Sequence, residues 1–162
     1  SFAEIEEESQ ASQNAALSVL NHLVNLYNDK TKDLEKKKGL NDDEEDATLQ
    51  QSDAEDESSE KPLIELLHSN VRRVVNFLET SAPAVELETS YDKKFVPLGH
   101  LRLRLVELIF NLLKLNNPSI LHALAETEAF AKIARLMVDY PWNNFLQLKA
   151  ISIFEEVFES ED

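Results

Sequence analysis

The 162-residue sequence contains no cysteine and only two glycines. Without cysteine, the chain can form neither a disulfide nor a thiolate metal site. Such scarce glycine, together with abundant Leu, Ala, Glu and Lys, favours helices over a hairpin-rich β fold. No apolar run approaches the ~20 residues that a membrane-spanning helix needs. The absences therefore favour a helical protein that is not inserted in a membrane.

Basic residues are also few, and the formal net charge is −15. Residues 40–61, LNDDEEDATLQQSDAEDESSEK, hold ten acids and one base, so this stretch alone contributes −9. It contains almost nothing to bury and cannot offset the entropy of ordering, which predicts a disordered acidic loop. Phosphate binding needs clustered Lys and Arg, so we expect no nucleic-acid partner.

Apolar residues recur at helical spacing along the rest of the chain. They predict helices at about 12–37, 62–80, from 98 onward, 118–125, 127–139 and 143–159. Pro62 suits the first turn of the second helix. The third helix is apolar over so wide a face that it should be largely buried. The last helix presents an apolar stripe of Phe145, Leu148, Ile151, Phe154 and Phe158.

Several of these helices are apolar on more than one face and so need cover on two sides. The predicted fold is therefore all-α, an armadillo- or HEAT-like helical solenoid segment with a long acidic insert at 40–61. A closed helix bundle is the competing architecture, and no clean internal repeat is visible. Because the sequence begins without Met and ends on an apparent helix, we expect residues 1–162 to be one fragment of a larger helical-repeat domain.

The sequence offers no constellation typical of catalysis or cofactor binding. None of the four histidines has a metal-binding partner at a suitable helical spacing, and the two glycines form no phosphate-binding loop. We therefore predict a protein that is not an enzyme and has neither metal nor cofactor. In the acidic stretch, Ser52 and Ser58 stand close to carboxylates, a context that acid-directed kinases prefer, and are candidate phosphorylation sites.

Arg102 and Arg104 flank Leu103 near the start of the third helix. They could be surface arginines, with Arg104 pairing with Glu107 at a spacing of three residues. They could equally be partner contacts, because arginine is enriched in interfaces.

The stretch DYPWNNFLQL, residues 139–148, is typical of a corner between two helices. Pro141 ends the preceding helix. Asn143 or Asn144 can cap the next one, and a single cap position leaves the other amide facing outward. Trp142 is expected to lie buried across the corner as a hydrophobic clamp.

The same residues carry a resemblance to a known family. Pro97-Leu-Gly99 with Arg102 and Leu103, then Asn117-Pro118-Ser119-Ile120, then Tyr140 and Trp142-Asn-Asn-Phe-Leu146 resemble the SAPS domain in order and spacing. Residues 12–20 and 62–80 fit that domain more loosely. Gln147 departs from the pattern, because relatives usually carry His there.

SAPS proteins are regulatory subunits of type-6 Ser/Thr protein phosphatases. The resemblance implies a helical scaffold that binds the phosphatase catalytic subunit and directs it to substrates, with further scaffold subunits as additional partners. It also implies a place in the cytoplasm, with the nucleus as a second compartment. A generic armadillo-like scaffold in another pathway is the alternative. The candidate partner-binding residues are Arg102, Arg104, Trp142, Asn143, Asn144 and Gln147.

Overall fold

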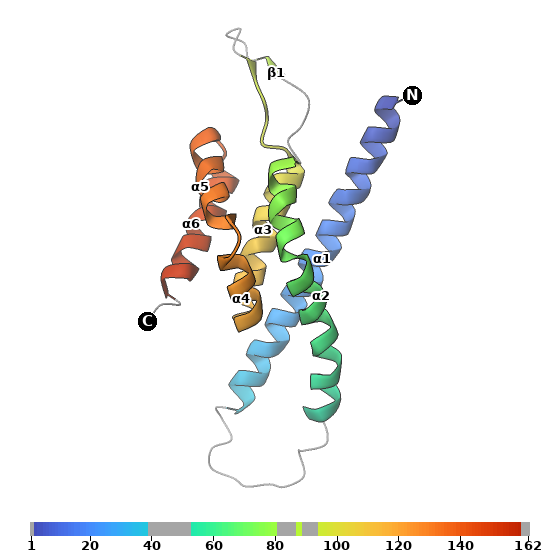
Figure 1. Ribbon diagram of the computed structural model, residues 1–162, viewed down its shortest axis with the longest axis vertical. Helices are drawn as coiled ribbons and strands as arrows, with labels where there is room; N and C mark the ends of the chain where they lie inside the picture. The colour runs from blue at the N-terminus through green and yellow to red at the C-terminus, as the bar shows by residue number, and fades with distance from the viewer. Residues whose placement is uncertain (1, 39–52, 81–86, 89–93, 160–162) are drawn as a thin grey trace.

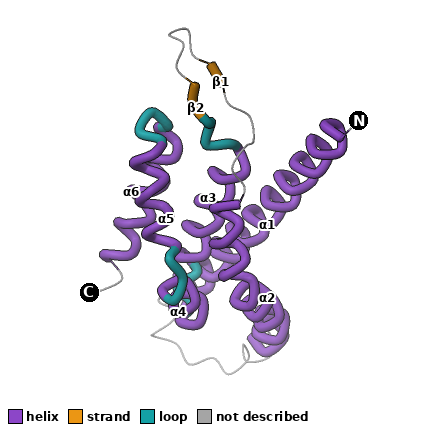
Figure 2. The backbone as a smooth tube through the Cα atoms, turned by 45° about the horizontal axis from the view of Figure 1, so that its top comes forward, coloured by secondary structure: helices purple, strands orange, loops and turns teal. Residues whose placement is uncertain are grey.

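The computed structural model describes residues 2–38, 53–80, 87–88 and 94–159. This part of the chain forms six helices and one pair of very short strands (Figures 1 and 2). The helices are α1 (Phe2–Lys38), α2 (Asp53–Thr80), α3 (His100–Lys114), α4 (Pro118–Ala125), α5 (Ala129–Asp139) and α6 (Asn144–Glu159). The strands β1 (Leu87–Glu88) and β2 (Lys94–Phe95) pair antiparallel, with Leu87 opposite Phe95. Two-residue strands are too short to produce an alternating pattern, so the sequence did not predict them.

Helix α3 occupies the centre of the molecule. It packs against α1 on one side and α6 on the other, and also contacts α2 and α4 (Figures 1 and 2). Most of its apolar residues are almost wholly shielded from solvent, among them Leu105, Val106, Leu108, Ile109 and Leu112. The prediction of a largely buried third helix is confirmed, because a helix with so wide an apolar face needs neighbours on several sides.

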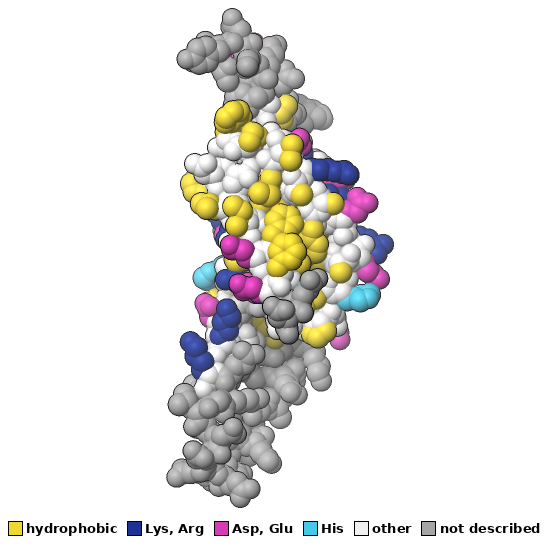
Figure 3. All heavy atoms as spheres, turned by 90° about the vertical axis from the view of Figure 1, so that its left-hand side faces the viewer, with side chains coloured by type: hydrophobic (Ala, Val, Ile, Leu, Met, Phe, Trp, Pro, Cys, Tyr) yellow, Lys and Arg dark blue, Asp and Glu magenta, His cyan; other side chains and the backbone are white. Residues whose placement is uncertain are grey.

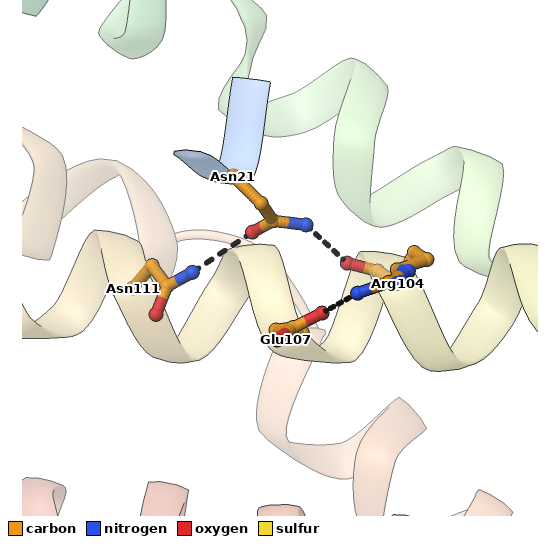
Figure 4. Close-up of polar contacts among 4 residues, drawn as sticks. All are labelled: Asn21, Arg104, Glu107 and Asn111. Atoms are coloured by element: carbon orange, nitrogen blue, oxygen red, sulfur yellow. Dashed lines mark hydrogen bonds and ion pairs between the residues drawn. The ribbon is translucent and has the colours of Figure 1, made fainter. Parts of the chain in front are cut away.

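Buried asparagines join α1 to α3. Asn21 and Asn28 stand seven residues apart on α1 and face α3. Asn111 Nδ2 donates to Asn21 Oδ1 at 2.9 Å, and Asn21 Nδ2 donates to the carbonyl of Arg104 at 3.2 Å (Figure 4). Asn28 Nδ2 donates to the carbonyl of Asn111 at 3.1 Å. Because buried amides need partners, these bonds select one register of α1 along α3.

Three consecutive residues account for the geometry of the turn from α3 to α4. Asn116 has a positive φ of 47°, a conformation that asparagine tolerates better than most residues. Asn117 then caps α4, its Oδ1 accepting from the backbone N–H of Ser119 and of Ile120. Pro118 occupies the first turn, where its missing N–H costs nothing. Helix α4 matches the prediction at 118–125.

Two helices begin earlier than predicted. Helix α1 starts at Phe2 rather than near residue 12, and α2 starts at Asp53, so that Pro62 lies inside the helix instead of opening it. Acidic residues favour the positive end of the helix dipole, which accounts for a start in the DAEDE stretch. Residues 40–52 of the predicted acidic loop lie outside the described residues, and their disorder stays a prediction.

The all-α class is confirmed, whereas the finer architecture is not shown. The six helices have 37, 28, 15, 8, 11 and 16 residues, so no single repeat unit is visible among the described residues. The armadillo- or HEAT-like solenoid, and the assignment of residues 1–162 to one fragment of a larger repeat domain, stay predictions.

Candidate functional site

The corner between α5 and α6 is held by backbone and side-chain hydrogen bonds. Helix α5 ends at Asp139, and Asn143 caps α6, with its Oδ1 accepting from the Leu146 N–H at 3.0 Å. The Asn143 N–H donates to the carbonyl of Tyr140 at 3.1 Å, which closes the turn. Asn144 is exposed. The prediction of one capping and one outward-facing asparagine is confirmed.

Trp142 projects from this corner into solvent and is 91% exposed. The prediction of a buried clamp is therefore wrong. The first turn of α6 is instead anchored by Leu146, which is fully buried, and by the hydrogen bonds of Asn143. Because those contacts already hold the turn, the indole ring has no packing role there.

The exposed apolar surface continues along α6. Phe145 is 75% exposed and Leu148 66%, and Ile151 follows at the same spacing of three residues. We call these three residues the α6 outer face. These three residues belong to the apolar stripe predicted from the sequence but do not enter the core, because the fully buried positions are Leu146, Ala150 and Ile153. Figure 3 shows the side of the molecule that carries α5 and α6, where apolar side chains gather.

A groove of about 460 Å³ lies beside the α6 outer face. We call it the α3–α6 groove, and its lining is His100, Leu103, Arg104, Glu107, Phe145 and Lys149. Arg104 Nη1 bonds Glu107 Oε2 at 2.8 Å, so the predicted pairing at a spacing of three residues is confirmed (Figure 4). Arg104 is half-buried at the groove and remains a candidate for partner contact.

Arg102 has a different environment from Arg104. It is buried, only 9% exposed, and its guanidinium donates to the carbonyls of Leu78 and Glu79, both at 3.2 Å. A third bond joins Nη1 to the hydroxyl of Tyr140 at 3.0 Å. We call this set the Arg102 clasp. A cation at the carbonyl end of α2 also complements the helix dipole.

The prediction of a surface position for Arg102 is therefore wrong. Three acceptors from two elements satisfy its guanidinium, so the side chain is held inside the protein despite its charge.

Gln147 is a second corner residue whose side chain faces inward. Its Nε2 donates to the carbonyl of Met137 at 2.9 Å and to that of Tyr140 at 3.3 Å. Met137 is in the last turn of α5, where carbonyls have no partner in a following turn of the helix. The Tyr140 carbonyl also accepts from the Asn143 N–H. Gln147 is half-buried rather than exposed and ties α6 to α5, and its role as a partner contact stays a prediction.

A comparison with protein families matches residues 3–123 to SAPS, described as SIT4 phosphatase-associated protein. That range is well over half of the chain. The chain belongs to the SAPS family. No curated protein and no solved structure matches it.

Members of the SAPS family are non-catalytic regulatory proteins that associate with phosphatases, so the predicted absence of enzymatic activity is confirmed by family. The SAPS match covers α1 to most of α4, including Arg102 and Arg104. It ends before Trp142, so the corner that resembles the family most closely by its residues lies beyond the matched range.

The remaining predictions concern phosphorylation, metal binding and membrane insertion. Ser52 lies outside the described residues, and the side chain of Ser58 is not described, so their phosphorylation stays a prediction. Within the described ranges, no group of three or more His, Asp or Glu side chains could hold a metal ion. None of the described helices has both the length and the apolar character to cross a membrane.

The structure thus separates the predicted site residues into exposed ones and ones that face inward. Trp142 and Asn144 are exposed, and Arg104 lines the adjoining groove. The sequence did not single out Phe145 or Lys149 as site residues. The sequence did contain a signal for Phe145. Helix α6 has apolar residues on opposite faces, and because only one of these faces can pack on α3, the other is left exposed.

Proposed function

We propose that this SAPS chain binds the catalytic subunit of a type-6 Ser/Thr phosphatase and directs it to substrates. The observation that carries the proposal is the family match over α1–α4, because SAPS proteins are phosphatase-associated. Directing the enzyme to substrates requires the chain to hold two proteins at once. The surface available for this purpose includes both the α6 outer face and the exposed corner.

The geometry supports a rigid binding surface rather than a chemical centre. The Arg102 clasp and Gln147 hold the ends of α2 and α5 in place, so the corner carrying Trp142 is preorganised. A preorganised surface loses less conformational entropy when it binds than a mobile one. Large exposed aromatic side chains are also the residue type that most often dominates binding energy.

Co-precipitation of the full-length protein with the type-6 catalytic subunit tests the proposal. We expect the catalytic subunit to be enriched over a related type-2A catalytic subunit expressed at the same level. Absence of enrichment, with an unbiased pull-down dominated by proteins outside the phosphatases, would favour a scaffold in another pathway.

The directing role has its own test. Depleting the full-length protein should leave total catalytic-subunit activity on a small phosphopeptide unchanged. At the same time, phosphorylation should rise on a restricted set of proteins that co-precipitate with the chain. A uniform rise across phosphoproteins would contradict a targeting role.

A further inference from the structure

The α3–α6 groove combines an apolar wall with uncompensated positive charge. Phe145 and Leu103 form apolar walls of the groove, and Arg104 and Lys149 are its basic residues. Among the described lining residues, Glu107 is the sole acid, and it is already paired with Arg104. The basic residues therefore outnumber the acidic ones in a chain whose net charge is −15.

Among the described residues, no carboxylate pairs with the second cation of the groove, Lys149. The Lys149 ammonium lies 4.4 Å from the centroid of the Phe110 ring, and the Lys114 ammonium lies 4.5 Å from the same centroid. No ion pair joins either lysine to an acid among the described residues. A ring face attracts a cation less strongly than a carboxylate does, so both ammonium groups keep capacity for an anionic partner.

The apolar residues beside the groove point to what else the partner carries. Phe145 is 75% exposed, Leu148 lies one helical turn further along α6 and is also exposed, and Trp142 is exposed at the preceding corner. A partner that covers them must present large apolar side chains, because polar groups facing them would lose water without gaining hydrogen bonds. Complementary charge at the edge of such a surface fixes the register in which the partner binds and raises the association rate.

We propose that the α3–α6 groove and the α6 outer face together bind an acidic segment of the phosphatase catalytic subunit. The segment places a large apolar side chain against Phe145 and a carboxylate near Lys149 and Arg104. The choice of an acidic occupant rests on the local excess of positive charge, and the choice of the phosphatase rests on the proposed function above.

Affinity measurements with the purified full-length protein and catalytic subunit test the charge. Lys149→Glu should weaken binding by roughly tenfold or more, while Lys149→Arg should stay close to wild type. The loss should shrink as salt is raised, because an ionic contact at the groove is screened. The matched control is Arg73→Glu, which reverses an exposed cation on α2, away from the groove, and should leave affinity unchanged.

The apolar half of the proposal has a separate variant. Phe145→Ser should weaken binding by roughly tenfold, since exposed aromatic anchors commonly carry this much. Leu26→Ser, which changes an exposed apolar residue on α1, is its control. Circular dichroism should show that all variants remain helical.

Photo-crosslinking identifies the occupant. With p-benzoylphenylalanine in place of Trp142, the crosslinked peptide should come from an acidic segment of the catalytic subunit, and the same probe at Val19 should give no such product.

If wild-type protein binds but the Lys149 and Phe145 variants bind equally well, the groove is not the docking site and the proposed function stands. If wild-type protein does not bind, the proposed function fails and this assignment fails with it. A crosslink to a basic or uncharged segment would overturn the acidic occupant alone.

Discussion

The Arg102 clasp and the exposed corner at Trp142 both lie at the C-terminal end of α5, yet their key residues have opposite environments. The charged residue is buried with three hydrogen bonds, and the indole ring of Trp142 is 91% exposed. Residue type alone would assign them the other way round. Burial here depends on the neighbouring groups rather than on residue type. A charged side chain can be buried when hydrogen-bond acceptors surround it, and an aromatic ring without packing neighbours stays in solvent.

Tyr140 links the two regions. Its hydroxyl accepts from Arg102 in the clasp, and its carbonyl accepts from Asn143 and from Gln147 in the corner. The clasp therefore orients the corner from which Trp142 projects. Substitutions on either side of Tyr140 should separate a stabilising role from a binding role.

The largest expected effect is at the clasp. Arg102→Met keeps the volume of the side chain but leaves the carbonyls of Leu78 and Glu79 without this donor. We expect a loss of about 3 kcal/mol in the free energy of unfolding, measured by urea denaturation. Arg102→Lys retains the charge without the forked donors and should recover only part of the loss. A loss below about 1 kcal/mol for Arg102→Met would contradict the clasp.

The buried amides between α1 and α3 should give the next largest effect. Asn111→Leu leaves Asn21 Oδ1 without its donor, and we expect a loss of about 2 kcal/mol in unfolding free energy. Adding Asn21→Leu should restore part of this loss, because both polar partners are then gone. A double-mutant cycle in urea measures the coupling, and strict additivity would show that the two amides do not interact.

Capping at the corner should contribute less. Asn143→Ala removes the acceptor for the Leu146 N–H and should cost about 1 kcal/mol, measured from the thermal melting curve. Asn144→Ala is the matched control, since its exposed side chain is not the cap. Equal losses for the two variants would mean that Asn143 does not act as the cap.

The smallest effect on stability is expected at Trp142. Trp142→Ala removes a ring that is almost wholly in solvent, so unfolding free energy should stay within about 0.5 kcal/mol of wild type. Binding to the catalytic subunit should nevertheless weaken in a purified affinity assay. A loss of several kcal/mol in unfolding free energy would show that the ring packs as a buried clamp, and it would contradict the contrast with Arg102.

Much of the fold followed from the sequence. The all-α class, the helix at 118–125 and the burial of the third helix were predicted, because apolar spacing and the Asn117-Pro118 start signal act within a few residues. The helix starts at Phe2 and Asp53 were missed, since the mainly acidic and polar sequence of these stretches shows no apolar periodicity. For the candidate site, the asparagine cap and the Arg104–Glu107 pair were predicted, and both lie within one turn of helix.

The sequence by itself determined where each helix lies except for the starts of α1 and α2, where the turn residues stand and that the chain belongs with SAPS proteins. Only the tertiary structure decided that Arg102 and Gln147 face inward, that Trp142 faces outward and that α6 packs through Leu146, Ala150 and Ile153. Local signals act between neighbours in the chain, whereas the acceptors of Arg102 are 23, 24 and 38 residues away. Burial of such a side chain depends on which distant groups the packed helices bring within hydrogen-bond reach.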